Sequence, residues 1–211
     1  MAGTTSFDEI AASMKRAAAA LRGADIEFAL AGSLATWARG GPKSSHDLDF
    51  VIRERDGERA LDALEAIGMR REDPPEEWLV KAWDQNGVLV DLIFGPSGVD
   101  ADRVLAGAEV VNVLSMEIPV MALEDVIVTK VMSLTEHSID YGTLLEMARA
   151  LREQIDWDEV RRRTAESPFA DAYFVILDRL EIVPERGSGG ADGGDASRVR
   201  VEVSRSGEGS P

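Results

Sequence analysis

Apolar residues recur every three or four positions at the start of the chain, which is the pattern of one buried helix face. These residues are Phe7, Ile10, Met14, Ala17 and Leu21. Ser6 precedes them and Glu9 follows it by three residues, the spacing of a capping box. The pattern therefore predicts a helix that begins after Ser6 and ends at Gly23.

Two apolar runs follow, residues 26–31 and 47–53, and both are typical of strands. Between them, residues 34–38 favour a short helix that Gly40, Gly41 and Pro42 break. A strand places alternate side chains on opposite faces. The second strand then turns three apolar side chains to one face, namely Leu48, Phe50 and Ile52. Its other face presents Asp47 and Asp49, about 7 Å apart along the strand.

A third carboxylate is expected in the same sheet. Residues 78–84 and 88–94 read as strands joined by Asn86-Gly87, a strong short-range hairpin signal. Asp91 lies in the middle of the second of these strands, where an isolated carboxylate is costly to bury without a partner. We expect Asp91 to converge with Asp47 and Asp49, with no basic residue in a strand to neutralise them.

The remaining elements are mostly helical. Residues 57–67 form an amphipathic helix that Gly68 ends, residues 100–106 a short helix, and residues 109–114 an edge strand. Further helices are expected over residues 123–134, 141–151, 157–166 and 168–180, with Arg161, Arg162 and Arg163 on a solvated face. The pattern predicts an α+β fold, a small mixed β-sheet flanked by helices and followed by a C-terminal helical bundle.

Composition and length set the expected organisation. The chain has 211 residues and no cysteine, which leaves neither disulfides nor thiolate metal sites. We expect three parts: a first domain over residues 1–120, a helical region over 121–184 and a Gly/Ser/Asp-rich disordered tail over 185–211. No signal-peptide pattern and no long apolar run is present, so we expect a cytoplasmic protein without a membrane contact.

The formal net charge is −16, and only about −1 of it falls on residues 185–211. Nucleic-acid binding needs clustered Lys and Arg, so this surface favours a cationic small molecule or a basic protein partner over nucleic acid. Solubility alone is an alternative interpretation of the acidity.

The carboxylates indicate a metal and a phosphate. Two ionised carboxylates this close repel each other unless a cation lies between them. Oxygen ligands suit Mg²⁺ or Mn²⁺, which characteristically also bind substrate phosphates. Gly32 and Ser33 follow a strand and precede a helix, where backbone N–H groups and a hydroxyl are available to an anion.

With these residues the chain resembles the nucleotidyltransferase fold of the polymerase-beta type. It is nearest to the group that holds the antibiotic nucleotidyltransferases, for lincosamides and aminoglycosides, and the abortive-infection toxin nucleotidyltransferases. The resemblance covers about residues 24 to 135. Its motifs are Gly32-Ser33, Gly40-Gly41, Lys43-x-Ser45-x-Asp47-Leu48-Asp49-Phe50 and Val90-Asp91-Leu92, with Lys43 standing where arginine is commoner.

The resemblance implies a Mg²⁺- or Mn²⁺-dependent enzyme that transfers a nucleoside monophosphate from an NTP, such as ATP, to a hydroxyl and releases pyrophosphate. It assigns metal binding to Asp47, Asp49 and Asp91, and makes Asp91 the base that deprotonates the attacking hydroxyl. Gly32, Ser33, Lys43 and Ser45 would bind the nucleotide.

The resemblance also bears on two further residues, Lys130 and Asp140. Lys130 lies in a segment similar to one of the family and by that resemblance reaches the phosphates. A solvated helix lysine is the alternative. Asp140 matches only the last residue of the motif that usually follows.

Three functions stay open at this point. The acidity favours a small cationic acceptor, as in the antibiotic-resistance branch. The first alternative is the toxin of a toxin–antitoxin pair, which would nucleotidylate tRNA or protein and bind an antitoxin. The second is a non-catalytic nucleotide-binding member of the fold.

Overall fold

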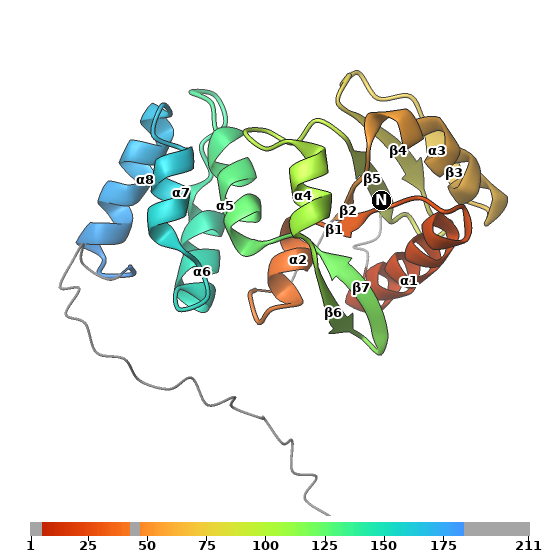
Figure 1. The fold of residues 1–211 in the computed structure, drawn as a ribbon, viewed down its shortest axis with the longest axis horizontal. Helices are drawn as coiled ribbons and strands as arrows, with labels where there is room; N and C mark the ends of the chain where they lie inside the picture. The colour runs from red at the N-terminus through yellow and green to blue at the C-terminus, as the bar shows by residue number, and fades with distance from the viewer. Residues whose placement is uncertain (1–5, 43–46, 184–211) are drawn as a thin grey trace, which may run out of the picture.

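The protein, seen here as a computed structural model, is described for residues 6–42 and 47–183. Its helices are α1 Phe7–Gly23, α2 Gly32–Trp37, α3 Gly57–Ala66, α4 Ala101–Gly107, α5 Leu123–Met132, α6 Tyr141–Leu151, α7 Trp157–Arg163 and α8 Pro168–Arg179, with a 3-10 turn at Glu54–Asp56. Its strands are β1 Ala29–Leu30, β2 Asp47–Val51, β3 Arg70–Glu72, β4 Leu79–Trp83, β5 Leu89–Ile93, β6 Glu109–Val113 and β7 Met116–Val120. The predicted α+β class is confirmed (Figure 1).

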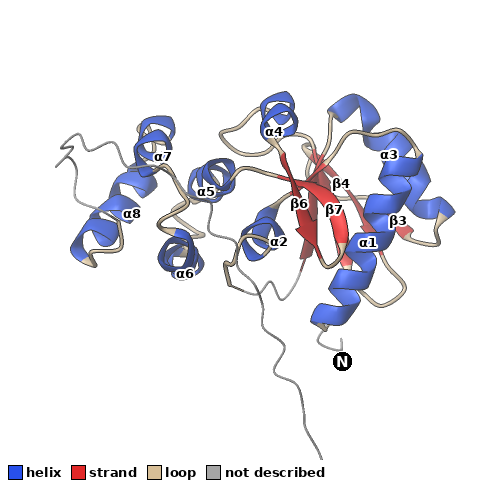
Figure 2. Ribbon diagram, turned by 60° about the horizontal axis from the view of Figure 1, so that its bottom comes forward, coloured by secondary structure: helices blue, strands red, loops and turns tan. Residues whose placement is uncertain are grey.

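The seven strands form one mixed sheet in the order β3-β4-β5-β2-β1-β7-β6. β2 and β5 are parallel neighbours, while β4 pairs with β5 as the predicted antiparallel hairpin. The apolar face of β2 is buried, with Leu48 and Phe50 fully enclosed. Figure 2 shows α1 and α3 side by side against the sheet, and α5 to α8 gathered at the other side of the molecule.

α1 begins as its sequence predicts. Glu9 N donates to the Ser6 hydroxyl, and Ser6 N donates to the Glu9 carboxylate at 2.7 Å. Both halves of the capping box are therefore present, and the apolar face of the helix is buried.

Several sequence-based boundaries were wrong. β1 spans only Ala29–Leu30 of the predicted 26–31, although Ile26 and Phe28 are buried. β3 and β7 were not predicted. α7 ends at Arg163 rather than at residue 166.

Some expectations fall on residues 43–46 and 184–211, outside the described part of the chain. These are the assignments of Lys43 and Ser45 to the nucleotide site and the disordered tail over 185–211.

Buried apolar side chains form two clusters. The larger runs from Ile10 to Val126 and lies around the sheet, while the second runs from Leu123 to Val183 among α5 to α8. α5 contributes Val126 to the first cluster and Ile127 to the second, so it is the helix shared by both. Within the described residues, no helix is both long and apolar enough to cross a bilayer.

Candidate active site

A row of three charged side chains crosses the sheet on the face opposite Leu48 and Phe50. Asp49 of β2 pairs in register with Asp91 of β5, and Asp91 pairs in register with Lys81 of β4. The Lys81 ammonium lies 4.0 Å from Asp91 Oδ2. The expectation that no basic strand residue neutralises the carboxylates was therefore wrong.

Gly32 closes the other end of this row. The Ala31 N–H donates to the Asp49 carbonyl at 2.9 Å, which brings the start of α2 against the middle of β2. Gly32 has φ +59°, and a Cβ at this position would lie 1.8 Å from Asp49 Oδ2. Only glycine fits both the backbone conformation and the space that Asp49 occupies. Ser33 follows in the first turn of α2.

Both aligned carboxylates are poorly solvated. Burial raises the pKa of Asp91 to about 7, with the Asp49 charge adding to the effect and Lys81 opposing it. Burial also raises the pKa of Asp49 to about 6, while Lys130 opposes the rise and Asp47 adds to it. Asp91 Oδ1 is buried and has no hydrogen-bond partner among the described residues. The pair would therefore be stabilised as anions by a cation.

The donor set fits a magnesium ion that is held together with a nucleotide. In the described residues, no group of three or more His, Cys, Asp or Glu side chains is placed to hold a metal by itself. Mg²⁺ is usually held by one or two carboxylates together with substrate phosphates, so Asp49 and Asp91 suffice as protein ligands. Asp47 lies two residues from Asp49, at the exposed start of β2.

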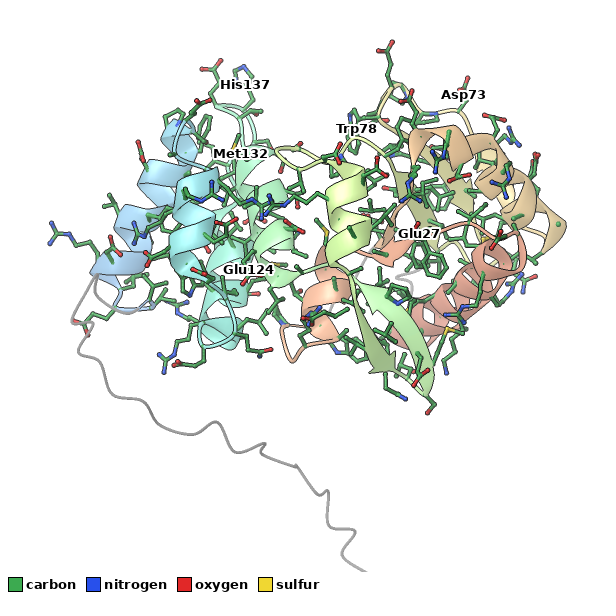
Figure 3. All side chains as sticks on the ribbon, viewed as in Figure 1. Glu27, Asp73, Trp78, Glu124, Met132 and His137 are labelled. Carbon is green, nitrogen blue, oxygen red and sulfur yellow. The ribbon has the colours of Figure 1, made fainter. Side chains whose placement is uncertain are left out.

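A cavity of about 260 Å³ opens beside Asp49. Its walls come from the sheet, from the turn at residues 95–98 and from α5. The lining includes Gly32, Asp49, Val51, Trp78, Ile93, Met121 and Lys130. Gly98 lies against α5, since a Cβ there would approach Met132 Cγ at 2.7 Å. Figure 3 labels Trp78 on the sheet half of the molecule and Met132 on the helical half.

The structure brings together most of the predicted site residues that it describes. Gly32, Asp49 and Lys130 line one cavity, and Asp91 is the register partner of Asp49. Asp140 lines a neighbouring cavity of about 190 Å³ that shares Lys130. Its carboxylate accepts from the Thr143 backbone N–H and hydroxyl at the start of α6.

Sequence reasoning missed three residues around the carboxylates, namely Glu76, Trp78 and Lys81. The Lys81 ammonium is 3.9 Å from Glu76 Oε2, so Glu76 flanks the row from the loop before β4. Trp78 stands directly before β4 and is 46% exposed. The sequence could have revealed Lys81, because the turn of the predicted hairpin determines which residue of β4 lies opposite Asp91.

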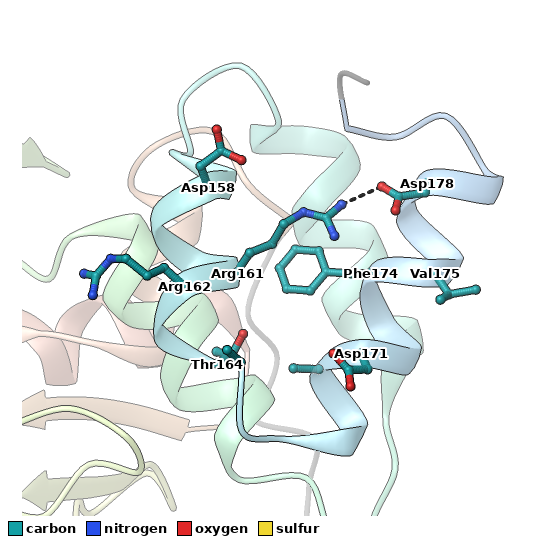
Figure 4. A pocket seen from close by; sticks show the side chains of 10 residues that line it. Asp158, Arg161, Arg162, Thr164, Asp171, Phe174, Val175 and Asp178 are labelled. Atoms are coloured by element: carbon teal, nitrogen blue, oxygen red, sulfur yellow. Dashed lines mark hydrogen bonds and ion pairs between the residues drawn. The ribbon is translucent and has the colours of Figure 1, made fainter. Parts of the chain in front are cut away.

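A larger cavity, of about 550 Å³, lies between α7 and α8 (Figure 4). Arg161 donates to Asp178 at 2.5 Å and its guanidinium lies 4.0 Å from the centre of the Phe174 ring. Of the predicted site residues that the structure describes, none lines this cavity. The expectation of a solvated arginine face was wrong for Arg161 and Arg163, whose side chains are 16% and 8% exposed.

Solved structures show which class this fold belongs to. One similar structure is the crystal structure of ANT(2″)-Ia in complex with adenylyl-2″-tobramycin, with a TM-score of 0.56, 13% identity, and coverage of 79% of this chain and 99% of that chain. The solution structure of the antibiotic-resistance factor ANT(2″)-Ia is also similar, with a TM-score of 0.57 and 13% identity. The match covers 83% of this chain and 99% of that chain. An antigenic nucleotidyltransferase-like protein from Paracoccidioides brasiliensis has a TM-score of 0.52 and 15% identity. That match covers 86% of this chain and 96% of that chain.

The chain thus has the nucleotidyltransferase fold. Residues 36–182, well over half of the chain, match the family described as uncharacterised nucleotidyltransferase. The protein belongs to that family and is a nucleotidyltransferase, which confirms the resemblance inferred from the motifs. No curated protein matches the sequence.

Proposed function

We propose that this nucleotidyltransferase uses Mg²⁺ or Mn²⁺ to transfer a nucleoside monophosphate from an NTP to a hydroxyl of a small cationic acceptor. The observation that carries the proposal is the register pairing of Asp49 with Asp91 beside Gly32. These residues join two oxygen ligands for a divalent cation to a backbone turn that only glycine can form.

The order of residues across the sheet gives the site two ends. Gly32 and Ser33 stand at one end and bind the β- and γ-phosphates through backbone N–H groups and the Ser33 hydroxyl. Lys130 faces Asp49 across the cavity and adds a positive charge on the same side. Lys43 and Ser45 belong to the same end by the motif.

Asp91 acts between Asp49 and Lys81, farther from Gly32. It accepts the proton of the attacking hydroxyl, and a pKa of about 7 is in the range that proton transfer near neutral pH favours. Asp49 and Asp91 would hold the divalent cation, with Asp47 at the exposed start of β2 adding negative charge nearby, and the cation would offset the charge of the triphosphate. Lys81 neutralises part of the carboxylate charge and keeps Asp91 in place.

Charge supports a cationic acceptor. A chain with a formal net charge of −16 concentrates cations near its surface and repels polyanions such as tRNA. ANT(2″)-Ia, whose fold is similar, was solved with an adenylylated aminoglycoside. We therefore propose that this protein modifies a small molecule. A role in antibiotic resistance follows from that proposal, rather than a role in a toxin–antitoxin system.

Calorimetry with non-hydrolysable NTPs tests the nucleotide part of the proposal. We expect binding in Mg²⁺ and little binding in EDTA. Asp49→Asn should abolish the metal-dependent part while circular dichroism stays unchanged. Asp171→Asn is the matched control, because Asp171 is exposed on α8. Equal affinity with and without metal would contradict the assignment of the carboxylates.

A further inference from the structure

Trp78 is an exposed aromatic side chain at the edge of the candidate active site. Its exposed fraction is 46%, whereas Trp157 is 8% exposed. Unlike the other exposed large apolar side chains of the described residues, Trp78 lines the cavity that contains Asp49, and a tryptophan there offers a ligand a large flat surface.

The cavity has a polar end and an apolar end. Gly32, Asp49 and Lys130 form the polar end, where the phosphates bind under the proposed function. Val51 and Ile93 lie one step further along the same faces of β2 and β5, and they pair with each other in register. Two residues along a strand span about 7 Å, which separates this apolar pair from the Asp49 and Asp91 carboxylates.

Trp78 lines the same cavity as the apolar pair Val51 and Ile93. Ile93 pairs in register with Leu79, the residue after Trp78, and the Phe94 N–H donates to the Trp78 carbonyl at 3.0 Å. Gly95 packs directly on the tryptophan, since a Cβ at Gly95 would lie 2.8 Å from Trp78 Cβ. The hairpin and Gly95 together fix the backbone and Cβ of Trp78, and its side chain lines the same cavity as Val51 and Ile93.

We propose that Trp78 is the residue against which the nucleobase of the NTP packs. This inference rests on the proposed function, because the phosphates must occupy the Gly32 and Lys130 end. Asp91 and Lys81 do not line the cavity, so an acceptor that approaches Asp91 enters beside it. Base–aromatic stacking is tolerant of sequence, which makes Trp78 a determinant of affinity for any NTP.

Two ligands separate the base from the phosphates. Calorimetry in Mg²⁺ compares the non-hydrolysable NTP that the wild type binds most tightly with inorganic tripolyphosphate. We expect Trp78→Ala to weaken the NTP on the order of 10- to 100-fold and to leave tripolyphosphate unchanged. Trp78→Phe should keep most of the affinity, because it retains a ring. Val110→Ala is the control, since Val110 is an exposed strand residue on β6.

Intrinsic fluorescence gives a second measurement. The emission would not respond to the base of the NTP if Trp78 only supported the fold. The chain has four tryptophans. We expect the NTP to quench the wild-type emission and tripolyphosphate to leave it unchanged, with the NTP effect lost in Trp78→Phe. Gly95→Ala should reduce NTP affinity as Trp78→Ala does, because the added methyl displaces the indole.

The outcomes distinguish this inference from the proposed function. If the wild type binds neither NTP nor tripolyphosphate in Mg²⁺, the proposed function fails and the inference with it. If the wild type binds the NTP but Trp78→Ala binds it equally well, the inference alone is wrong. An equal loss of NTP and tripolyphosphate affinity in Trp78→Ala also overturns it, because Trp78 would then support the fold rather than the base.

Discussion

At the scale of single residues, Gly32 determines where the Asp49 carboxylate can lie. The positive φ of Gly32 disfavours other residues by about 1–2 kcal/mol. The contact with Asp49 Oδ2 adds a second constraint that is specific to this position. A methyl group here displaces the carboxylate itself and not a neutral neighbour, so it acts on the site directly.

We expect Gly32→Ala to reduce metal-dependent NTP affinity at least tenfold and to destabilise the fold by about 1–2 kcal/mol. Gly68→Ala is the matched control, because Gly68 has φ +86° but nothing within 4 Å of its Cβ position. Gly68→Ala should show a similar loss of stability with unchanged NTP affinity. Calorimetry and urea unfolding measure the two quantities. NTP affinity equal in both variants would contradict the role of Gly32.

The raised pKa of Asp91 makes a prediction about stability and pH. Its carboxyl titrates near 3.8 in the unfolded chain and near pH 7 in the folded protein. Between these values the folded state binds more protons than the unfolded state, so the contribution of Asp91 to stability decreases as pH rises from about 4 to about 7. The size of this effect is on the order of 2 to 4 kcal/mol.

Asp91→Asn removes this titration. In EDTA, the free energy of unfolding of the variant minus that of the wild type should therefore increase between about pH 4 and pH 7. Urea unfolding at several pH values measures this difference. A difference that stays constant across the range would show that Asp91 is not held in a poorly solvated position.

The sequence predicts only some of the residues of the candidate site. Asp47 and Asp49 follow from the period of two in a strand, and Gly32 from its place between a strand and a helix. Lys81 depends on register across a hairpin. The turn from Asp84 to Gly87 sets Lys81 opposite Asp91, and counting back from it would have found the pair. Trp78 could not be predicted, because its role depends on α5, which is far away in sequence.

At the scale of elements, the sheet is larger than its sequence pattern predicts. β7 contains Pro119, which lacks an N–H and argues against a strand. The strand forms because β7 pairs with β6 along its whole length, with Pro119 opposite Val110, while its pairing with β1 is confined to Leu30 and Val120. β3 has the sequence Arg-Arg-Glu, with no apolar alternation, and is held by its pairing with β4. Tertiary partners decided both cases.

The consecutive arginines of α7 were difficult for a different reason. Successive helix residues point about 100° apart, so three neighbours cannot share one environment. Arg163 faces inward and its guanidinium is 2.6 Å from the carboxylate of Asp125 on α5, with both side chains under 10% exposed. Arg162 faces outward, is 67% exposed and pairs with Glu159 at 2.6 Å.

Removal of one partner from a buried ion pair leaves an uncompensated charge, which costs about 3–5 kcal/mol. Arg103 Nε also lies 3.9 Å from Asp125 Oδ1 and compensates part of that charge, so we expect Arg163→Ala to be destabilised by about 3 kcal/mol, the lower end of this range. Arg162→Ala, the matched neighbour, should lose less than about 1 kcal/mol, because exposed ion pairs contribute little. Urea unfolding of both variants provides the comparison. Similar unfolding midpoints would mean that Asp125 is solvated.

At the scale of the whole molecule, the candidate site lies where the two apolar clusters meet. The sheet supplies the carboxylates and α5, which packs into both clusters, supplies Lys130. The sequence predicted the strands and the helices separately. It did not predict that α5 stands across the cavity from β2, because that packing depends on contacts between distant parts of the chain.

The net charge of the whole molecule leads to the last prediction, the choice of acceptor. A formal charge of −16 attracts cations and repels polyanions over a distance of about 10 Å at 0.1 M salt. We expect nucleotide transfer to tobramycin, used as a cationic probe, in preference to tRNA. The apparent KM for tobramycin should rise several-fold between about 0.05 and 0.5 M NaCl, because salt screens the attraction.

The measurement is incorporation of labelled nucleotide into each acceptor at the two salt concentrations. Transfer to an uncharged small compound that carries a hydroxyl serves as the control, since its KM should change little with salt. Robust labelling of tRNA with none of either small molecule would reject the cationic acceptor and favour the toxin function. A KM for tobramycin that is independent of salt would mean that local contacts, rather than the net charge of the protein, select the acceptor.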